Sequence, residues 1–75
     1  MKVKKQKSHW MVQPEKGTGL FSIKNQYSEY VREHTPDGVY DYSPMLRCED
    51  NAERIAADLN SGVLQVDTDK HNTIK

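Results

Sequence analysis

The chain has 75 residues, equal numbers of acidic and basic side chains, and a single cysteine, Cys48. A chain of this length forms at most one domain, because it buries only about 60% of the surface that its unfolded form exposes. One cysteine cannot close a disulfide within the chain, and no apolar run approaches the roughly 18 residues that a membrane-spanning helix needs. We therefore expect a soluble cytoplasmic domain with a small core, for which self-association as a homodimer is an alternative source of stability.

Charge is distributed unevenly along the chain. Residues 1–24 carry six lysines and one glutamate, a net charge of +5, whereas residues 25–69 carry three arginines and ten carboxylates, a net charge of −7. The basic charge of residues 1–24 suits a phosphate-bearing partner, and the acidic charge of residues 25–69 suits a basic protein partner. A solvated tail and a solvated surface explain the same pattern without any partner.

The N-terminal part predicts a basic arm followed by a strand. Residues 1–7 are rich in lysine, lead into no signal-like apolar stretch, and are expected to form a flexible arm. Residues 8–13 contain strand formers, with Trp10 and Val12 on one face. Pro14 is expected to end this strand, because it cannot donate a backbone hydrogen bond.

The middle of the chain has two interpretations. Residues 15–19, which contain two glycines, predict a turn that leads to a second strand at 20–24 and so completes a hairpin. Apolar residues between 20 and 30 also fit a helical spacing. The turn-forming residues 25–28 and the alternation over 29–33 favour strand, turn and strand over a helix.

Two prolines mark the approach to the helix. Residues 35–38, Thr-Pro-Asp-Gly, predict a turn. Residues 39–44 are expected to form a short edge segment, because Pro44 limits further pairing. The short, mostly apolar run 45–48 then forms either a last strand or the lead into the helix cap.

The strongest pattern in the chain predicts a helix at about 50–61. Asp50 and Glu53 have the spacing of a capping box, and their carboxylates lie where the helix dipole favours negative charge. An apolar stripe follows the helical spacing and consists of Ala52, Ile55, Ala56 and Leu59. Asn60 or Gly62 is expected to end the helix in a left-handed conformation.

These elements predict one α+β domain over residues 8–66. Residues 63–66 form either a short terminal strand or a segment packed at the helix end, and the polar residues 67–75 predict a disordered tail. The expected fold is a three- to four-stranded antiparallel meander packed by one C-terminal helix, with mobile N- and C-terminal tails. The core residues expected to meet the helix are Trp10, Val12, Phe21, Ile23, Val31 and Leu46.

No pattern in the chain predicts an enzyme or a metal site. The three histidines and Cys48 lack the spacing of zinc ligands, and residues 17–19, Gly-Thr-Gly, lack the lysine of a phosphate-binding loop. Cys48 precedes a helix N-terminus, but the carboxylates that follow it disfavour a reactive thiolate. We expect no catalytic residue, no metal and no cofactor.

The tyrosine-rich part of the chain predicts a protein-binding module. Tyrosine and arginine are enriched at the centres of protein interfaces. The expected partner-binding residues are Tyr27, Tyr30, Arg32, Tyr40 and Tyr42. An open edge at 39–42 would also allow a partner strand to pair with this segment. The alternative is that two of the tyrosines complete the core and two are ordinary surface residues.

Nucleic-acid binding is the alternative function. The basic arm combines cationic side chains with a ring that can stack on bases. The residues expected to bind in that case are Lys2, Lys4, Lys5, Lys7 and Trp10. The exposed face of the helix, with Glu53 and Asp58, argues against a groove-reading role.

The apolar residues before and within the helix follow a recognisable layout. It reads Trp10-x-Val12, Phe21-x-Ile23, Tyr30-Val31 and Asn51-Ala52-x-x-Ile55-Ala56-x-x-Leu59-Asn60. Over about residues 9–60 this layout resembles short phage and prophage proteins, which place a small antiparallel sheet before a helix with an N-A-x-x-I-A pattern. The resemblance implies a small accessory protein that binds and modifies a host factor such as a polymerase, a nuclease or a defence complex. It implies no active-site residues.

Overall fold

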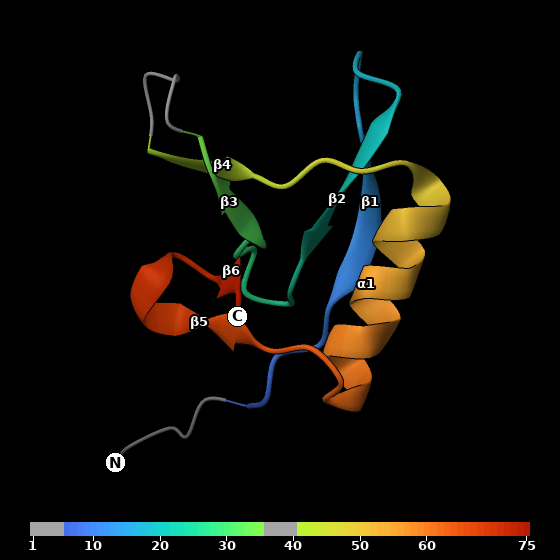
Figure 1. Ribbon diagram of the computed structural model, residues 1–75. Coiled ribbons are helices and arrows are strands. Elements are labelled where there is room, and N and C mark those ends of the chain that lie inside the picture. Colours follow the sequence, from blue (N-terminus) through green and yellow to red (C-terminus); the bar gives the residue numbers. More distant parts are fainter. Residues whose placement is uncertain (1–5, 36–40) are drawn as a thin grey trace.

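The computed structural model describes residues 6–35 and 41–75, which form one α-helix and two small sheets (Figure 1). In chain order the elements are β1 (Met11–Glu15), β2 (Leu20–Lys24), β3 (Arg32–His34), β4 (Tyr42–Pro44), α1 (Glu49–Ser61), β5 (Val66–Asp67), the 3-10 helix η1 (Thr68–Lys70) and β6 (Thr73–Ile74). The predicted α+β class is confirmed. The predictions for residues 1–5 of the arm and for residues 36–40 of the turn and edge segment lie outside the described residues. No helix in the described ranges has the length and apolar character to cross a membrane.

β1 and β2 form the predicted hairpin, and β1 continues through a proline. The strands pair antiparallel, with Val12 opposite Ile23 and Pro14 opposite Phe21. Phe21 directs its backbone groups away from β1, because its N–H donates to the carbonyl of Arg47 at 2.8 Å and its carbonyl accepts from the N–H of Arg47 at 2.9 Å. Pro14, which lies opposite Phe21, therefore needs no backbone N–H directed toward β2. The prediction that Pro14 ends the strand is wrong for this reason.

Asn25 organises the turn between β2 and β3. It is 2% exposed, and its Oδ1 accepts from the backbone N–H groups of Tyr27 and Glu29, both at 3.0 Å. Its Nδ2 donates to Ser8 Oγ at 3.1 Å and to Glu29 Oε1 at 2.9 Å. Ser28 adopts a left-handed conformation with a φ of 61°. The chain reverses here, which confirms strand, turn and strand rather than a helix.

The remaining strands form a second sheet with the order β4-β3-β6-β5, so the strands expected in one meander are divided between two sheets. β4 is an edge strand and pairs antiparallel with β3. β6 pairs parallel with β3 through Arg32 and Thr73, and the N–H of Arg32 donates to the carbonyl of Asn72 at 3.2 Å. The sheets are joined where the N–H of Val31 donates to the carbonyl of Ile23 at 2.9 Å.

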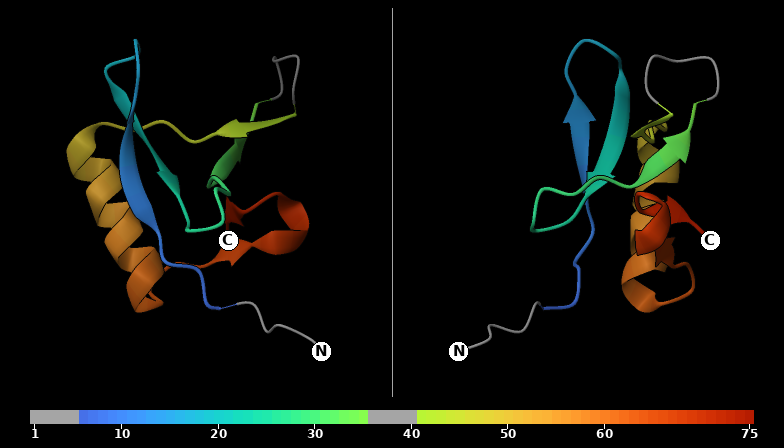
Figure 2. Two further views of the ribbon diagram at one scale, coloured as in Figure 1. Left: turned by 180° about the vertical axis from the view of Figure 1, so that it is seen from behind. Right: turned by 90° about the vertical axis from the view of Figure 1, so that its left-hand side faces the viewer.

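Residues 67–75, for which the sequence predicts disorder, form the end of β5, η1 and β6 beside β3 (Figure 2). Val66 and Ile74 are paired across β5 and β6, and both side chains pack partly buried against the core. The N–H of Lys75 donates to the carbonyl of Gln65 at 2.9 Å. The prediction of a disordered tail is wrong because Ile74, the one apolar side chain of residues 67–75, produces no periodicity, although together with Val66 it anchors the segment to the core.

α1 begins within one residue of its predicted start but without the predicted capping box. Cys48 occupies the N-cap position and makes no side-chain cap hydrogen bond. Because the helix starts at Glu49, Asp50 lies inside the first turn instead of at the capping position. Gly62, one of the two residues predicted to end the helix, does so with a φ of 88°.

The apolar stripe of α1 packs against the β1–β2 hairpin (Figures 1 and 2). The buried apolar residues of the described ranges are Trp10, Ile23, Val31, Met45, Ala52, Ala56 and Leu59. Those half-buried at the border of this core are Val12, Phe21, Ile55, Leu64, Val66 and Ile74. Met45 takes the place that the sequence assigns to Leu46. The N–H of Met45 donates to the carbonyl of Val31 at 2.9 Å, and the alternation of an extended chain turns Leu46 to the opposite side.

Asn60, in the last turn of α1, joins the helix to the start of β1. Its Oδ1 accepts from the N–H of Trp10 at 2.7 Å, and its Nδ2 donates to the carbonyl of Trp10 at 2.9 Å.

Asn60→Ala should lower the free energy of unfolding by about 1–2 kcal/mol, because both backbone groups of Trp10 lose their partner. Urea unfolding followed by Trp10 fluorescence measures this change. The exposed Asn51 provides the matched Asn51→Ala control, and equal losses in both variants would contradict the role of Asn60.

Candidate functional site

Three of the five predicted partner-binding residues lie at or beside the second sheet: Arg32 is in β3, Tyr42 is in β4, and Tyr30 directly precedes β3 and bridges Lys24 of β2. Arg32 and His34 lie on one face of β3 because strand residues alternate, and Tyr42 is paired with His34. The Tyr42 ring contacts the rings of His34 and His71, with centroid distances of 5.4 Å and 4.5 Å. Tyr30, Arg32 and His71 line one hollow. The Tyr42 surface is defined here as Tyr30, Arg32, His34, Tyr42 and His71.

The side chains of the Tyr42 surface reach solvent, and contacts with neighbouring side chains restrain both tyrosines. Tyr30, Arg32 and Tyr42 are half-buried, and both histidines are exposed. The Oη of Tyr30 accepts from Gln13 Nε2 at 3.0 Å, which holds the Tyr30 ring against the hairpin. Rigid tyrosine rings supply a large contact area at a low cost in side-chain entropy. This surface therefore has the properties of a preorganised contact area.

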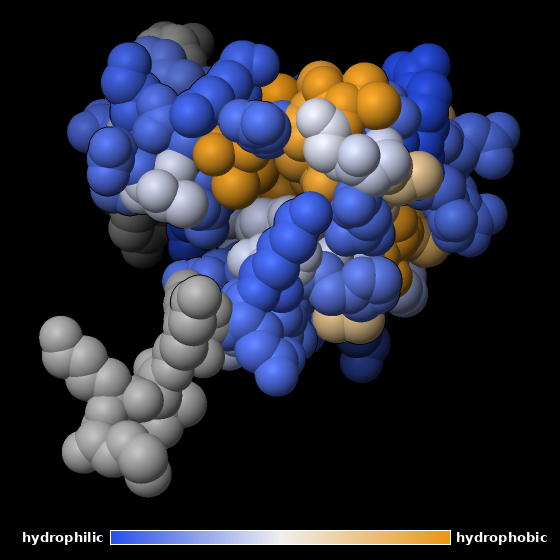
Figure 3. All heavy atoms as spheres, turned by 90° about the horizontal axis from the view of Figure 1, so that it is seen from below, coloured by the Kyte–Doolittle hydropathy of each residue, from blue (hydrophilic) through white to orange (hydrophobic). Residues whose placement is uncertain are grey.

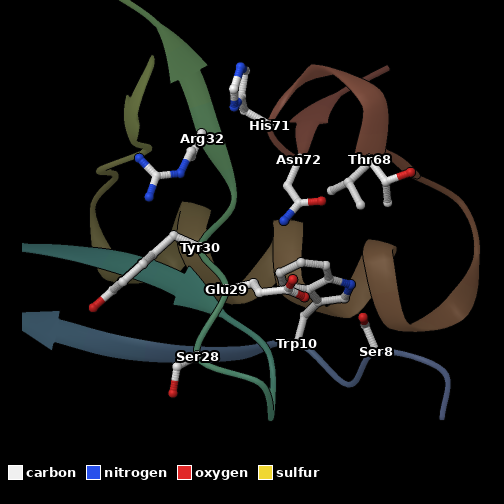
Figure 4. A pocket seen from close by; sticks show the side chains of 10 residues that line it. Ser8, Trp10, Ser28, Glu29, Tyr30, Arg32, Thr68, His71 and Asn72 are labelled. Atoms are coloured by element: carbon white, nitrogen blue, oxygen red, sulfur yellow. The ribbon is translucent and has the colours of Figure 1, made fainter. Parts of the chain in front are cut away.

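A hollow of about 440 Å³ adjoins the Tyr42 surface. Its centre holds Trp10 and Glu29, with Asn72 reaching in from the C-terminal segment (Figure 4). Tyr30 and Arg32 lie along one side of it (Figure 4). The hollow thus places fixed polar groups beside the rings.

Arg32 and Arg47 differ in how their guanidinium groups are paired. Arg47 forms an ion pair with Glu33, with an Nη2–Oε1 distance of 3.0 Å and an Nη1–Oε2 distance of 3.3 Å. Among the described residues, the side chain of Arg32 donates only to the carbonyl of Tyr42, at 3.5 Å. Within residues 6–35 and 41–75, no carboxylate lies within ion-pair distance of Arg32. Arg32 also lines a second hollow, of about 390 Å³, together with Tyr42 and Met45.

Tyr27 is separated from the other predicted partner-binding residues. It lies in the turn after β2 and is 39% exposed. Its Oη accepts from the backbone N–H of Gln6 at 2.9 Å and donates to the carbonyl of Gln6 at 3.1 Å. Tyr27 therefore holds the chain that precedes β1, and it is not part of the Tyr42 surface. Tyr40 lies outside the described residues.

The residues predicted for nucleic-acid binding are only partly described. Lys2, Lys4 and Lys5 lie outside the described ranges, and Lys7 is exposed. Trp10 is 6% exposed and belongs to the core. Stacking on a base requires an open ring face, so the role predicted for Trp10 is wrong.

The edge strands β1 and β4 each carry a proline. Pro14 provides no outward N–H in β1, and the N–H and carbonyl of Trp10 are already bound by Asn60. In β4, Pro44 lies opposite Arg32, whose own N–H points away from β4. Edge prolines reduce pairing with a further strand. Contact through side chains is therefore more favourable than the predicted addition of a partner strand at the β4 edge.

Seen from below, apolar side chains gather along one side of the molecule, and polar side chains cover much of the rest of this face (Figure 3). Val63, just after α1, is 73% exposed, the largest value among the exposed large apolar side chains of the described residues. Met11 and Leu20, the exposed aliphatic side chains of the hairpin, are close to 40% exposed, at 42% and 38%. Single exposed apolar side chains are ordinary on protein surfaces and do not define a site.

His34 and His71 are the members of the Tyr42 surface that sequence reasoning missed. The alternation over 29–33 could have placed His34 beside Arg32, because it continues into β3. His71 had no such signal, since its approach to Tyr42 depends on the pairing of β6 with β3. In the described ranges, no three His, Cys, Asp or Glu side chains are placed to hold a metal ion. Cys48 is an exposed free thiol.

Comparisons with protein-family models, with curated proteins and with solved structures each returned no match. The similarity to phage accessory proteins and the homodimer therefore stay predictions. The function must be inferred from the chemistry of the Tyr42 surface.

Proposed function

We propose that the chain is a small, non-catalytic protein-binding module that contacts its partner through the Tyr42 surface. The observation that carries the proposal is that residues 30–34, Tyr42 of β4 and His71 before β6, which are separate in the sequence, place two tyrosines, an arginine and two histidines close together. Tyrosine and arginine are the residue types most enriched among binding hot spots, together with tryptophan. The resemblance to phage accessory proteins suggests a host protein as the partner.

Preorganisation supports this proposal. The Tyr42 ring contacts two other rings, and Gln13 donates a hydrogen bond to Tyr30. A surface that is already ordered loses little side-chain entropy when a partner binds. The prolines in the edge strands β1 and β4 disfavour pairing with a partner strand, which favours recognition through these side chains.

Affinity capture from a bacterial lysate, with the chain immobilised and nuclease added, tests the proposal. Tyr42→Ala should reduce capture of the partner by about tenfold or more, because truncating a hot-spot ring costs on the order of 2 kcal/mol. Tyr27→Ala is the matched control, since Tyr27 lies outside the Tyr42 surface and should leave capture unchanged.

Two results of this capture would contradict the proposal. One is a stoichiometric protein that wild type and Tyr42→Ala retain equally. The other is recovery of nucleic acid alone, which nuclease removes. The second result would favour the predicted alternative, in which the lysine arm binds nucleic acid.

A further inference from the structure

Arg32 is half-buried, and within the described residues its guanidinium group has a single protein acceptor and no carboxylate partner. A guanidinium has five N–H donors, and the Arg32 side chain makes one hydrogen bond, to the carbonyl of Tyr42 at 3.5 Å. No carboxylate in residues 6–35 or 41–75 pairs with it, in contrast to the Arg47–Glu33 pair. A binding partner that covers Arg32 would remove its charge from water, and charges that are fully buried are almost always paired. Arg32 therefore has the properties of a group that pairs with an external anion.

The second sheet fixes the backbone from which this guanidinium group extends. Arg32 is opposite Pro44 in β4 and opposite Thr73 in β6, so strands hold its backbone on both sides. Its side chain borders both hollows. In Figure 4 the guanidinium points away from Glu29, toward the side on which Tyr30 lies. A planar donor that extends from a paired strand and lies beside rings suits bidentate contact with a carboxylate.

We propose that Arg32 binds a carboxylate side chain in a peptide segment of the protein partner. The rings of Tyr42 and His71 then contact the aromatic or aliphatic residue that stands beside the carboxylate. This inference rests on the proposed protein-binding function and specifies the chemistry of the segment that is bound. Arg32 supplies charge and orientation, and the rings supply apolar contact area.

A peptide carboxylate fits this surface better than a nucleic-acid backbone does. A nucleic acid requires several cations along its phosphates, whereas one carboxylate requires one guanidinium. Residues 25–69 carry a net charge of −7. Glu29 lines the hollow next to Arg32, and the exposed Asp41 directly precedes Tyr42. These carboxylates repel an extended polyanion more than they repel an isolated acidic side chain.

Selection from a displayed library of random peptides tests the inference. It is carried out in parallel on the wild-type chain, on Arg32→Gln and on Arg54→Gln, since Arg54 is exposed on α1 and controls for the loss of one arginine. The expected peptides carry aspartate or glutamate beside an aromatic or aliphatic residue. Their affinity for Arg32→Gln should fall about tenfold or more, because a charge-assisted hydrogen bond is lost. Arg54→Gln should bind them as wild type does.

Arg32→Lys is a second variant that keeps the charge and removes the planar fork, so it should recover only part of the affinity. It also keeps the test decisive if Arg32→Gln does not fold, which circular dichroism checks.

The inference is overturned if the peptides lack acidic residues, if Arg32→Gln or Arg32→Lys binds them as wild type does, or if none are selected. Binding of a labelled oligothymidine that depends on Arg32 would assign the guanidinium to nucleic acid instead. A protein captured through Tyr42 but indifferent to Arg32→Gln would overturn the carboxylate contact and leave the proposed function intact.

Discussion

Asn25→Ala should lower the free energy of unfolding by about 3 kcal/mol, because buried polar groups that lose their partner cost about 1–3 kcal/mol each. Asn25 is 2% exposed, and its side chain makes four hydrogen bonds. Two of them satisfy the backbone N–H groups of Tyr27 and Glu29, which build the turn between β2 and β3. A domain of this size is stable by only about 4–11 kcal/mol, so this one substitution removes a large share of its stability.

Urea unfolding followed by Trp10 fluorescence measures the effect. Asn25→Asp keeps an acceptor for the two backbone N–H groups but loses the donor to Glu29, so its loss should be large as well, since two carboxylates then face each other. Asn51→Ala, on the exposed face of α1, should change the free energy of unfolding by less than about 0.5 kcal/mol. A loss for Asn25→Ala no larger than that of this control would show that the turn does not depend on Asn25.

Deleting residues 66–75 should also lower the free energy of unfolding by about 3 kcal/mol, because two partly buried aliphatic side chains leave the core. Val66 and Ile74 pack against the core, and Arg32 loses its parallel backbone partner in β6. A disordered tail, which is what the sequence alone predicts, could be removed without effect. The deletion therefore distinguishes a disordered C-terminal tail from a C-terminal segment that pairs with β3 and packs against the core.

Two point variants accompany this deletion. Ile74→Ala should account for about 1–2 kcal/mol of the loss, because its half-buried side chain contributes only part of a full core residue. Lys70→Ala, at an exposed position of η1, should leave stability within about 0.5 kcal/mol of wild type. An unchanged urea midpoint for the truncated chain would contradict the pairing of β6 with β3.

Local patterns predicted the elements that depend on short-range spacing. Strand formers and glycines defined the β1–β2 hairpin, because the two strands and their turn are contiguous. The apolar stripe from Ala52 to Leu59 predicted both the helix and its buried face. Gly62 ends α1 with a positive φ that few other residues adopt.

Features that depend on distant contacts were not predictable in this way. Pro14 fits inside β1 only because Phe21 pairs with Arg47 on its other side. The order of residues 67–75 depends on a parallel pairing with β3, which leaves no periodic signal. The same limit applies to the candidate site. Composition identified tyrosines suited to an interface, but it could not separate Tyr42 from Tyr27, which faces the chain before β1.

The central claim is that the Tyr42 surface binds a protein partner, and amide chemical shifts of the isotope-labelled chain test it most directly. The spectrum is recorded before and after addition of the protein that the wild-type chain captures. The largest changes should fall on β3, β4 and residues 71–73, and the exposed face of α1 around Glu53 should change little. Changes concentrated on α1 or on the tip of the β1–β2 hairpin would contradict the claim.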